Sequence, residues 1–147
     1  MGGLKRGCVK IGFKRVGICD CKFERAIWNN NGKIIIADHV DFGQGTRIVN
    51  SGELVIGRNL MIKANSSIIC HKKISFGDDV LISWDVLFMD TDYHIIYNLS
   101  LPESQINEPR EIVIGHHVWV GCRCLILKGS MIPNDSVVAA GAVICGH

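Results

Sequence analysis

The feature that most constrains the fold of this chain is a six-residue rhythm of apolar residues. Three consecutive blocks of twenty residues, 32–51, 52–71 and 72–91, align without gaps. Apolar residues recur six positions apart in every block: Ile36, Phe42, Ile48; Ile56, Ile62, Ile68; Phe76, Ile82, Phe88. A period of six fits neither an amphipathic helix nor a simple hairpin. It is typical of short strands that each end in a turn, three of which close one triangular coil, with the coils stacked in parallel roughly 4.8 Å apart.

The rhythm is interrupted once and then resumes at Ile112 and Ile114. The step from Ile48 to Ile56 is eight positions, whereas the step from Phe88 to Ile114 is 26, so about 18 residues are inserted at one corner. A long insertion in a compact repeat fold is usually functional or mobile.

The pattern therefore predicts an all-β protein, a parallel β-helix of about five triangular coils with one long inserted loop. We expect a single domain over residues 1–147, with these parts: 1–31, an irregular or degenerate first coil; 32–91, regular coils; 92–111, the extruded loop; 112–147, the C-terminal coils.

Composition narrows the function classes. With 48% hydrophobic and 20% charged residues the chain can bury a core, and a net charge of +2 is too small to favour nucleic acid or a membrane surface. No apolar run approaches the roughly 20 residues of a membrane span, and the start MGGLKRGCVKIG has no apolar signal region. The seven cysteines form no CxxC pair and are interpreted as reduced thiols. We therefore expect a cytoplasmic protein that needs no metal.

The insertion begins with the densest cluster of titratable groups, because Asp90, Asp92 and His94 lie within five residues. A count of hexads would point His94 inward, as a core histidine, but the repeat has already stopped there. We therefore expect His94 at the loop root, where neutral imidazole can act as a base near neutral pH. Asp92, two positions away, is a candidate to orient the ring, with a solvated turn carboxylate as the alternative.

The segment IVIGHHVWVGCRCLILKGSMIPNDSVVAAGAVI (112–144), together with DTDYH, resembles the hexapeptide-repeat acyltransferases, and most of all the polysaccharide and sugar O-acetyltransferases. The resemblance implies a left-handed parallel β-helix and homotrimers with active sites between neighbouring subunits. It also implies acetyl-coenzyme A as acyl donor and a carbohydrate or nucleotide-sugar acceptor. In that family a loop histidine removes the proton of the acceptor hydroxyl, and His94 matches it.

On the donor side, the resemblance implies backbone N–H contacts to the acetyl and pantetheine groups at stacked small-residue turns. The matching positions are Gly121, Cys122, Ala140 and Gly141, for which simple turn chemistry is the alternative. Relatives continue beyond AVICGH with residues that hold the nucleotide. Either the sequence is truncated here, or Lys128, Arg123 and a neighbouring subunit hold the 3′-phosphate.

On the acceptor side, strand alternation points Trp119 outward, where its flat ring could stack against a sugar. The family places tryptophan near the active site, so Trp119 joins His94 and Asp92 as a catalytic candidate, with packing against the loop as the alternative. The candidate acceptor contacts are Asp90, Tyr97, Asn98 and Asn107.

Other functions stay open at this point. The same histidine could serve an N-acetyltransferase acting on an amino sugar, or a serine or small-sugar acetyltransferase. A metal-dependent β-helix hydratase needs about three converging histidines, and only His71 and His94 share a corner. A non-catalytic scaffold would need neither the DTDYH segment nor the insertion.

Overall fold

The computed structural model describes residues 7–12 and 25–146, which form a parallel β-solenoid with three faces. Face A contains β1 (Val9–Ile11), β4 (Val40–Phe42), β7 (Met61–Ile62), β10 (Leu81–Ile82), β15 (Trp119–Val120) and β18 (Val137–Val138). Face B contains β2 (Ile27–Asn30), β5 (Arg47–Asn50), β8 (Ser67–Cys70), β11 (Leu87–Met89), β16 (Leu125–Leu127) and β19 (Val143–Ile144). Face C contains β3 (Lys33–Asp38), β6 (Glu53–Arg58), β9 (Lys73–Phe76), β14 (Ile112–Ile114) and β17 (Met131–Ile132).

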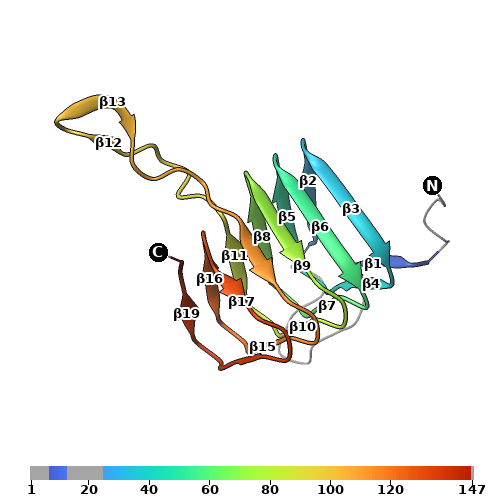
Figure 1. The fold of residues 1–147 in the computed structure, drawn as a ribbon. Coiled ribbons are helices and arrows are strands. Elements are labelled where there is room, and N and C mark those ends of the chain that lie inside the picture. Colours follow the sequence, from blue (N-terminus) through green and yellow to red (C-terminus); the bar gives the residue numbers. More distant parts are fainter. Residues whose placement is uncertain (1–6, 13–24, 147) are drawn as a thin grey trace.

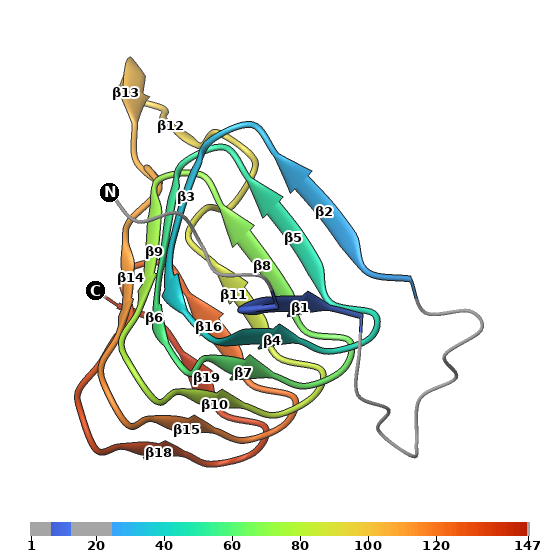
Figure 2. The ribbon, with the colours of Figure 1, turned by 90° about the vertical axis from the view of Figure 1, so that its right-hand side faces the viewer.

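The three faces form the sides of a triangle when the solenoid is viewed along its axis (Figure 2). Strands of successive coils pair in parallel, as in the column Ile34, Leu54, Ile74 and Ile112 of face C. The all-β, parallel solenoid predicted from the hexads is confirmed. With about six turns, it is slightly longer than the expected five coils, because β1 and β2 lie within the segment expected to be degenerate. The rest of that segment, residues 1–6 and 13–24, lies outside the described residues.

The six-residue rhythm reappears as columns of buried side chains. On face A the column contains Phe42, Ile62, Ile82 and Val120, none of them more than 1% exposed. Each inward residue packs on its equivalents one coil above and below, so the repeat removes a continuous apolar stack from water, which is the dominant favourable term in folding. The rings of Phe76 and Phe88 add an edge-to-face contact across the core at 5.0 Å.

The inserted loop leaves the solenoid after β11, at the corner between faces B and C, and returns at β14. It contains an antiparallel hairpin of β12 (Tyr97–Asn98) and β13 (Leu101–Gln105), which projects away from the stacked coils (Figure 1). Ile112 then pairs with Ile74, the position that the repeat count assigns to it. Nowhere in the described ranges is there a helix long and apolar enough to cross a membrane.

Candidate active site

Asp90 lies directly after β11, at the point where the loop leaves the coil. Its carboxylate is fully buried and accepts hydrogen bonds from three successive backbone N–H groups, those of His71 at 2.7 Å, Lys72 at 2.8 Å and Lys73 at 2.8 Å. Both oxygens are therefore engaged, and the side chain is out of reach of an acceptor. The expectation that Asp90 contacts the substrate is corrected, because this carboxylate belongs to the frame of the corner.

His94 lies at the loop root with an exposed side chain. It follows Tyr93, whose positive φ of 61° turns the chain sharply, and its backbone N–H donates to the carbonyl oxygen of Asp92 at 2.7 Å. The Tyr93 ring packs edge-on against His71 of the preceding coil, with centroids 4.8 Å apart. The backbone that carries the imidazole is thus anchored to the solenoid while the ring faces outward.

Asn107, from the returning arm of the loop, holds this backbone in place. Its amide nitrogen donates to the His94 carbonyl oxygen at 2.6 Å and to the Asp92 carboxylate at 3.0 Å, and its amide oxygen accepts from the Ile96 N–H at 2.7 Å. The residue is only 8% exposed. Within one chain Asn107 is therefore a clip between the two arms of the loop, and its contact with an acceptor stays a prediction.

The Asp92 carboxylate pairs with Lys128 at 2.5 Å, and the same ammonium donates to the Asn107 carbonyl oxygen at 3.3 Å. Hydrogen bonds from Lys128 and then Asn107 hold the pKa of Asp92 below its usual value. Within the described residues no hydrogen bond joins this carboxylate to the His94 ring, so it does not orient the imidazole in the way expected. Lys128, expected to bind a phosphate, is instead a partner of the loop root.

Tyr97 and Asn98 lie on the projecting hairpin. Tyr97 is exposed, and the Asn98 side chain accepts from the Ser100 N–H at 2.8 Å within the turn. In one chain the hairpin points away from the coils, so neither residue faces a surface of its own solenoid (Figure 1).

Trp119 lies on face A and is 50% exposed, which confirms the outward orientation predicted from strand alternation. Its indole N–H donates to the Ser83 hydroxyl at 3.2 Å, which fixes the ring. The ring lines a groove of about 390 Å³ whose polar rim includes His117, bonded through Nδ1 to Asp135 at 2.9 Å. Face A is opposite the corner from which the loop leaves (Figure 2), so one chain does not bring Trp119 and His94 together. A contact between His94 and Trp119 therefore requires two copies of the chain, and it stays a prediction.

The four small residues expected on the donor side lie at a third place, the corner between faces A and B. Gly121 is buried, and a Cβ there would lie 2.6 Å from the Ala140 nitrogen of the next coil, so only glycine permits this stacking. The Gly141 N–H donates to the Cys122 carbonyl oxygen at 2.8 Å, and Gly141 has a positive φ of 74°. Ala140 and Gly141 are exposed, which leaves a narrow, low surface along this edge.

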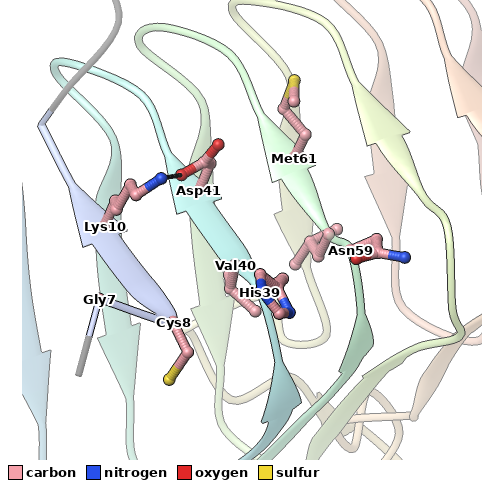
Figure 3. A pocket seen from close by; sticks show the side chains of 9 residues that line it. Gly7, Cys8, Lys10, His39, Val40, Asp41, Asn59 and Met61 are labelled. Carbon is pink, nitrogen blue, oxygen red and sulfur yellow. Dashed lines mark ion pairs between the residues drawn. The ribbon is translucent and has the colours of Figure 1, made fainter. Parts of the chain in front are cut away.

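A second groove on face A lies near the N-terminal coils (Figure 3). It measures about 150 Å³ and is crossed by an ion pair between Lys10 and Asp41, 4.0 Å apart, while His39 and Asn59 form part of its rim. None of the residues expected at the site lines it. Over residues 7–12 and 25–146, a single chain forms no group of three His, Cys, Asp or Glu side chains arranged to hold a metal ion.

The predicted residues thus fall into four groups within one chain: the loop root, the projecting hairpin, face A, and the corner between faces A and B. Asn107 as a clip and Lys128 as its partner were missed. The repeat itself offered a signal for Lys128, because β11 and β16 pair in register and place Lys128 one coil above Asp90.

Comparison with known proteins finds O-acetyltransferases. The chain is 35% identical over 102 residues to a polysialic acid O-acetyltransferase of Neisseria meningitidis, covering 68% of this chain and 47% of that protein. It is 32% identical over 89 residues to the galactoside O-acetyltransferase of Escherichia coli K12, covering 60% and 43%. It is 30% identical over 127 residues to the putative lipopolysaccharide biosynthesis O-acetyl transferase WbbJ of E. coli K12, covering 80% and 64%. No family model matches the chain. The chain spans about half the length of the first two relatives and 64% of the third.

Among solved structures, the crystal structure of the polySia-specific acetyltransferase NeuO is similar, with a TM-score of 0.55 and 22% identity over 83% of this chain and 75% of that one. Over residues 25–146 the fold is a hexapeptide-repeat β-solenoid with one long inserted loop. The chain is homologous to O-acetyltransferases that act in carbohydrate chemistry.

Proposed function

We propose that the protein transfers an acetyl group from acetyl-coenzyme A to a carbohydrate hydroxyl, with His94 as general base. The observation that carries the proposal is the state of His94: its imidazole is exposed, and its backbone is clipped by Asn107 to the returning arm of the loop. Two of the relatives are named for a polysialic acid and a galactoside acceptor, which supports a sugar hydroxyl. A polysaccharide or a nucleotide-sugar fits the same chemistry.

The chemical step needs a base at one point and a positive dipole at another. As the hydroxyl oxygen attacks the thioester carbon, the free ring nitrogen of His94 takes its proton. The oxyanion that forms is stabilised by backbone N–H groups, and the C–S bond then breaks. The sulfur leaves with the proton that the imidazolium returns, so His94 ends the cycle neutral.

The donor fits the corner between faces A and B. A thin pantetheine arm can lie along the low edge at Ala140 and Gly141, where a Cβ added to Gly141 would meet no atom within 4 Å. Because this edge and Trp119 are both remote from His94 within one chain, we place the complete site between two copies in a homotrimer. His94 of one copy then faces Trp119 and the acetyl group bound by the next. Free thiols at Cys122 and Cys145 fit a reducing cytoplasm.

The test is coenzyme A release with a panel of glycan, galactoside and amino-sugar acceptors. We expect His94→Ala to lower turnover by about 10²–10⁴-fold. His39→Ala is the matched control, since His39 is also exposed but lies at the corner between faces C and A, paired with Asp38. Turnover of His94→Ala within a few-fold of wild type would disprove the assignment.

The shared site has its own test. Neither His94→Ala nor Trp119→Ala should be active alone, but mixed oligomers of the two should regain activity, because one interface then contains both native residues. No recovery in mixed oligomers, with mixing verified by mass spectrometry, would show that each chain works by itself.

A further inference from the structure

A groove of about 490 Å³ beside the loop root is unlike the other grooves because its charged groups are mostly cationic. Three of its lining side chains are Lys72, Arg110 and Lys128, and the one carboxylate among the lining residues is Glu108. The chain as a whole has a net charge of only +2, so this concentration of positive charge is local.

The three cations form one column. Ile112 pairs with Ile74 and Val113 with Met131, and extending this register by two or three positions aligns Lys72, Arg110 and Lys128 on successive coils. Neighbouring coils are roughly 4.8 Å apart, so a single anionic group can lie between two of these side chains. The equivalent positions in the two preceding coils are Gly32 and Gly52. Among the described residues, cations therefore occur at this register position only in the coils next to the inserted loop.

The column is only partly neutralised. Lys128 pairs with Asp92, and Arg110 donates through one guanidinium nitrogen to the Gly146 carbonyl oxygen at 2.8 Å. The exposed Lys72 ammonium has no hydrogen-bond or ion-pair partner among residues 7–12 and 25–146. An ammonium and a guanidinium with free donors, in adjacent coils, suit a carboxylate.

We propose that this column, and Lys72 with Arg110 in particular, is a subsite for a carboxylate of the acceptor, so that the acceptor is an acidic sugar. The inference rests on the proposed function, because that function supplies the acceptor. Asn107 lines this groove and also clips the His94 carbonyl, so an anion here lies next to the base. Within one chain the corner expected to hold the acyl donor is a different one, and the coenzyme A comparison below distinguishes the acceptor carboxylate from the phosphates of a donor bound by a neighbouring copy.

The experiment measures binding without chemistry. An oligosialic acid, with one carboxylate on each sugar, is titrated into the protein with no acetyl donor present. We expect Lys72→Gln to raise the Kd about tenfold, the loss typical of one charge-assisted hydrogen bond, and Lys72→Arg to keep most of the affinity. Binding to wild type should weaken as salt rises. The control is Lys73→Gln, because that neighbouring ammonium pairs with Glu53 at 3.6 Å instead of facing the groove.

Two comparison ligands decide what is recognised. The methyl ester of the same oligomer, without its charges, should bind no more tightly to wild type than to Lys72→Gln. Coenzyme A should bind both proteins equally. The proposal is overturned if Lys72→Gln binds the acid as wild type does, or if it weakens coenzyme A by the same factor. Failure of the proposed function would look different, because carboxylate binding would depend on Lys72 while no acceptor released coenzyme A.

Discussion

The corner between faces B and C occurs in two forms within the same molecule. In the early coils it is a plain turn, where the Asn31 N–H donates to the Asn50 carbonyl oxygen at 2.7 Å and the Ser51 N–H to the Cys70 carbonyl oxygen at 2.8 Å. At the inserted loop the equivalent carbonyl oxygen, that of Asp90, accepts from the Arg110 N–H at 3.0 Å instead. There the N–H groups at 71–73 donate to the side chain of Asp90.

The difference teaches how a solenoid tolerates an insertion. Buried backbone N–H groups must find an acceptor. At the loop the two carboxylate oxygens of Asp90 take the place of the backbone carbonyl oxygens that accept at this corner in the early coils. This allows the coil below the loop to remain regular while the chain above it carries His94 outward. A frame residue and a site residue are therefore only four positions apart in sequence, with different tasks.

The largest effect should come from removing the Asp90 carboxylate. In Asp90→Ala three buried N–H groups lose their acceptor, so we expect a loss of about 3 kcal/mol or more in the free energy of unfolding. Urea unfolding followed by circular dichroism measures it. Asn50→Ala at the same corner two coils earlier removes side-chain bonds to Asn30 and to the Lys33 carbonyl oxygen, and should cost less. Equal losses in the two variants would contradict the comparison.

A smaller, local effect is expected at the clip. Asn107→Ala removes the acceptor of the Ile96 N–H and the donor to the His94 carbonyl oxygen, so the loop root should open more often. We expect amide hydrogen exchange at Ile96 to accelerate about tenfold, with little change in the core strands. Asn98→Ala, in the hairpin, is the control. Unchanged exchange at Ile96 would mean that the clip does not hold the loop.

The ion pair between Asp92 and Lys128 should make the stability of the protein depend on pH. Asp92 has a lowered pKa, so its contribution to stability is present above the ordinary carboxyl pKa of 3.8 and is lost as the pH falls through the lowered value. In Lys128→Met the Asp92 pKa should rise, and in Lys128→Arg it should stay low, as followed by carboxyl NMR. Since Asp92 is 39% exposed, screening should limit the change in stability to about 0.5 kcal/mol. An unchanged Asp92 pKa in Lys128→Met would show that Lys128 does not pair with Asp92 at the loop root.

The smallest effect concerns the reactivity of the Cys70 thiol, in the coil next to the loop. Burial, together with the neighbouring charge of Asp90, raises the pKa of the Cys70 thiol to about 12. We therefore expect Cys70 to resist iodoacetamide at pH 8.5 in the folded protein, while the exposed Cys145 reacts. Peptide mass spectrometry after brief labelling distinguishes the two, and equal labelling would mean that this corner opens readily.

Much of this architecture could be predicted because the repeat is a local signal. Positions six apart share one environment, so Ile56 or Val120 can be assigned to the core by counting, and Trp119 to the outside by alternation. The roles of Asp90, Asn107 and Lys128 could not be predicted in the same way. Each depends on a partner in another coil or on the far arm of the loop, and such pairs leave no periodic trace in one sequence.

The sequence by itself determined the parallel solenoid, the corner at which the loop leaves, and the histidine at its root, because stacking identical short strands is the one efficient way to bury a six-residue rhythm. Only the tertiary structure decided how the polar residues of the loop are used. Three coils meet at that corner, and the distances among their carboxylates, amides and ammonium groups assign Asp90 to the frame and Asn107 with Lys128 to the root. The same three-sided geometry separates His94 from Trp119 within one chain.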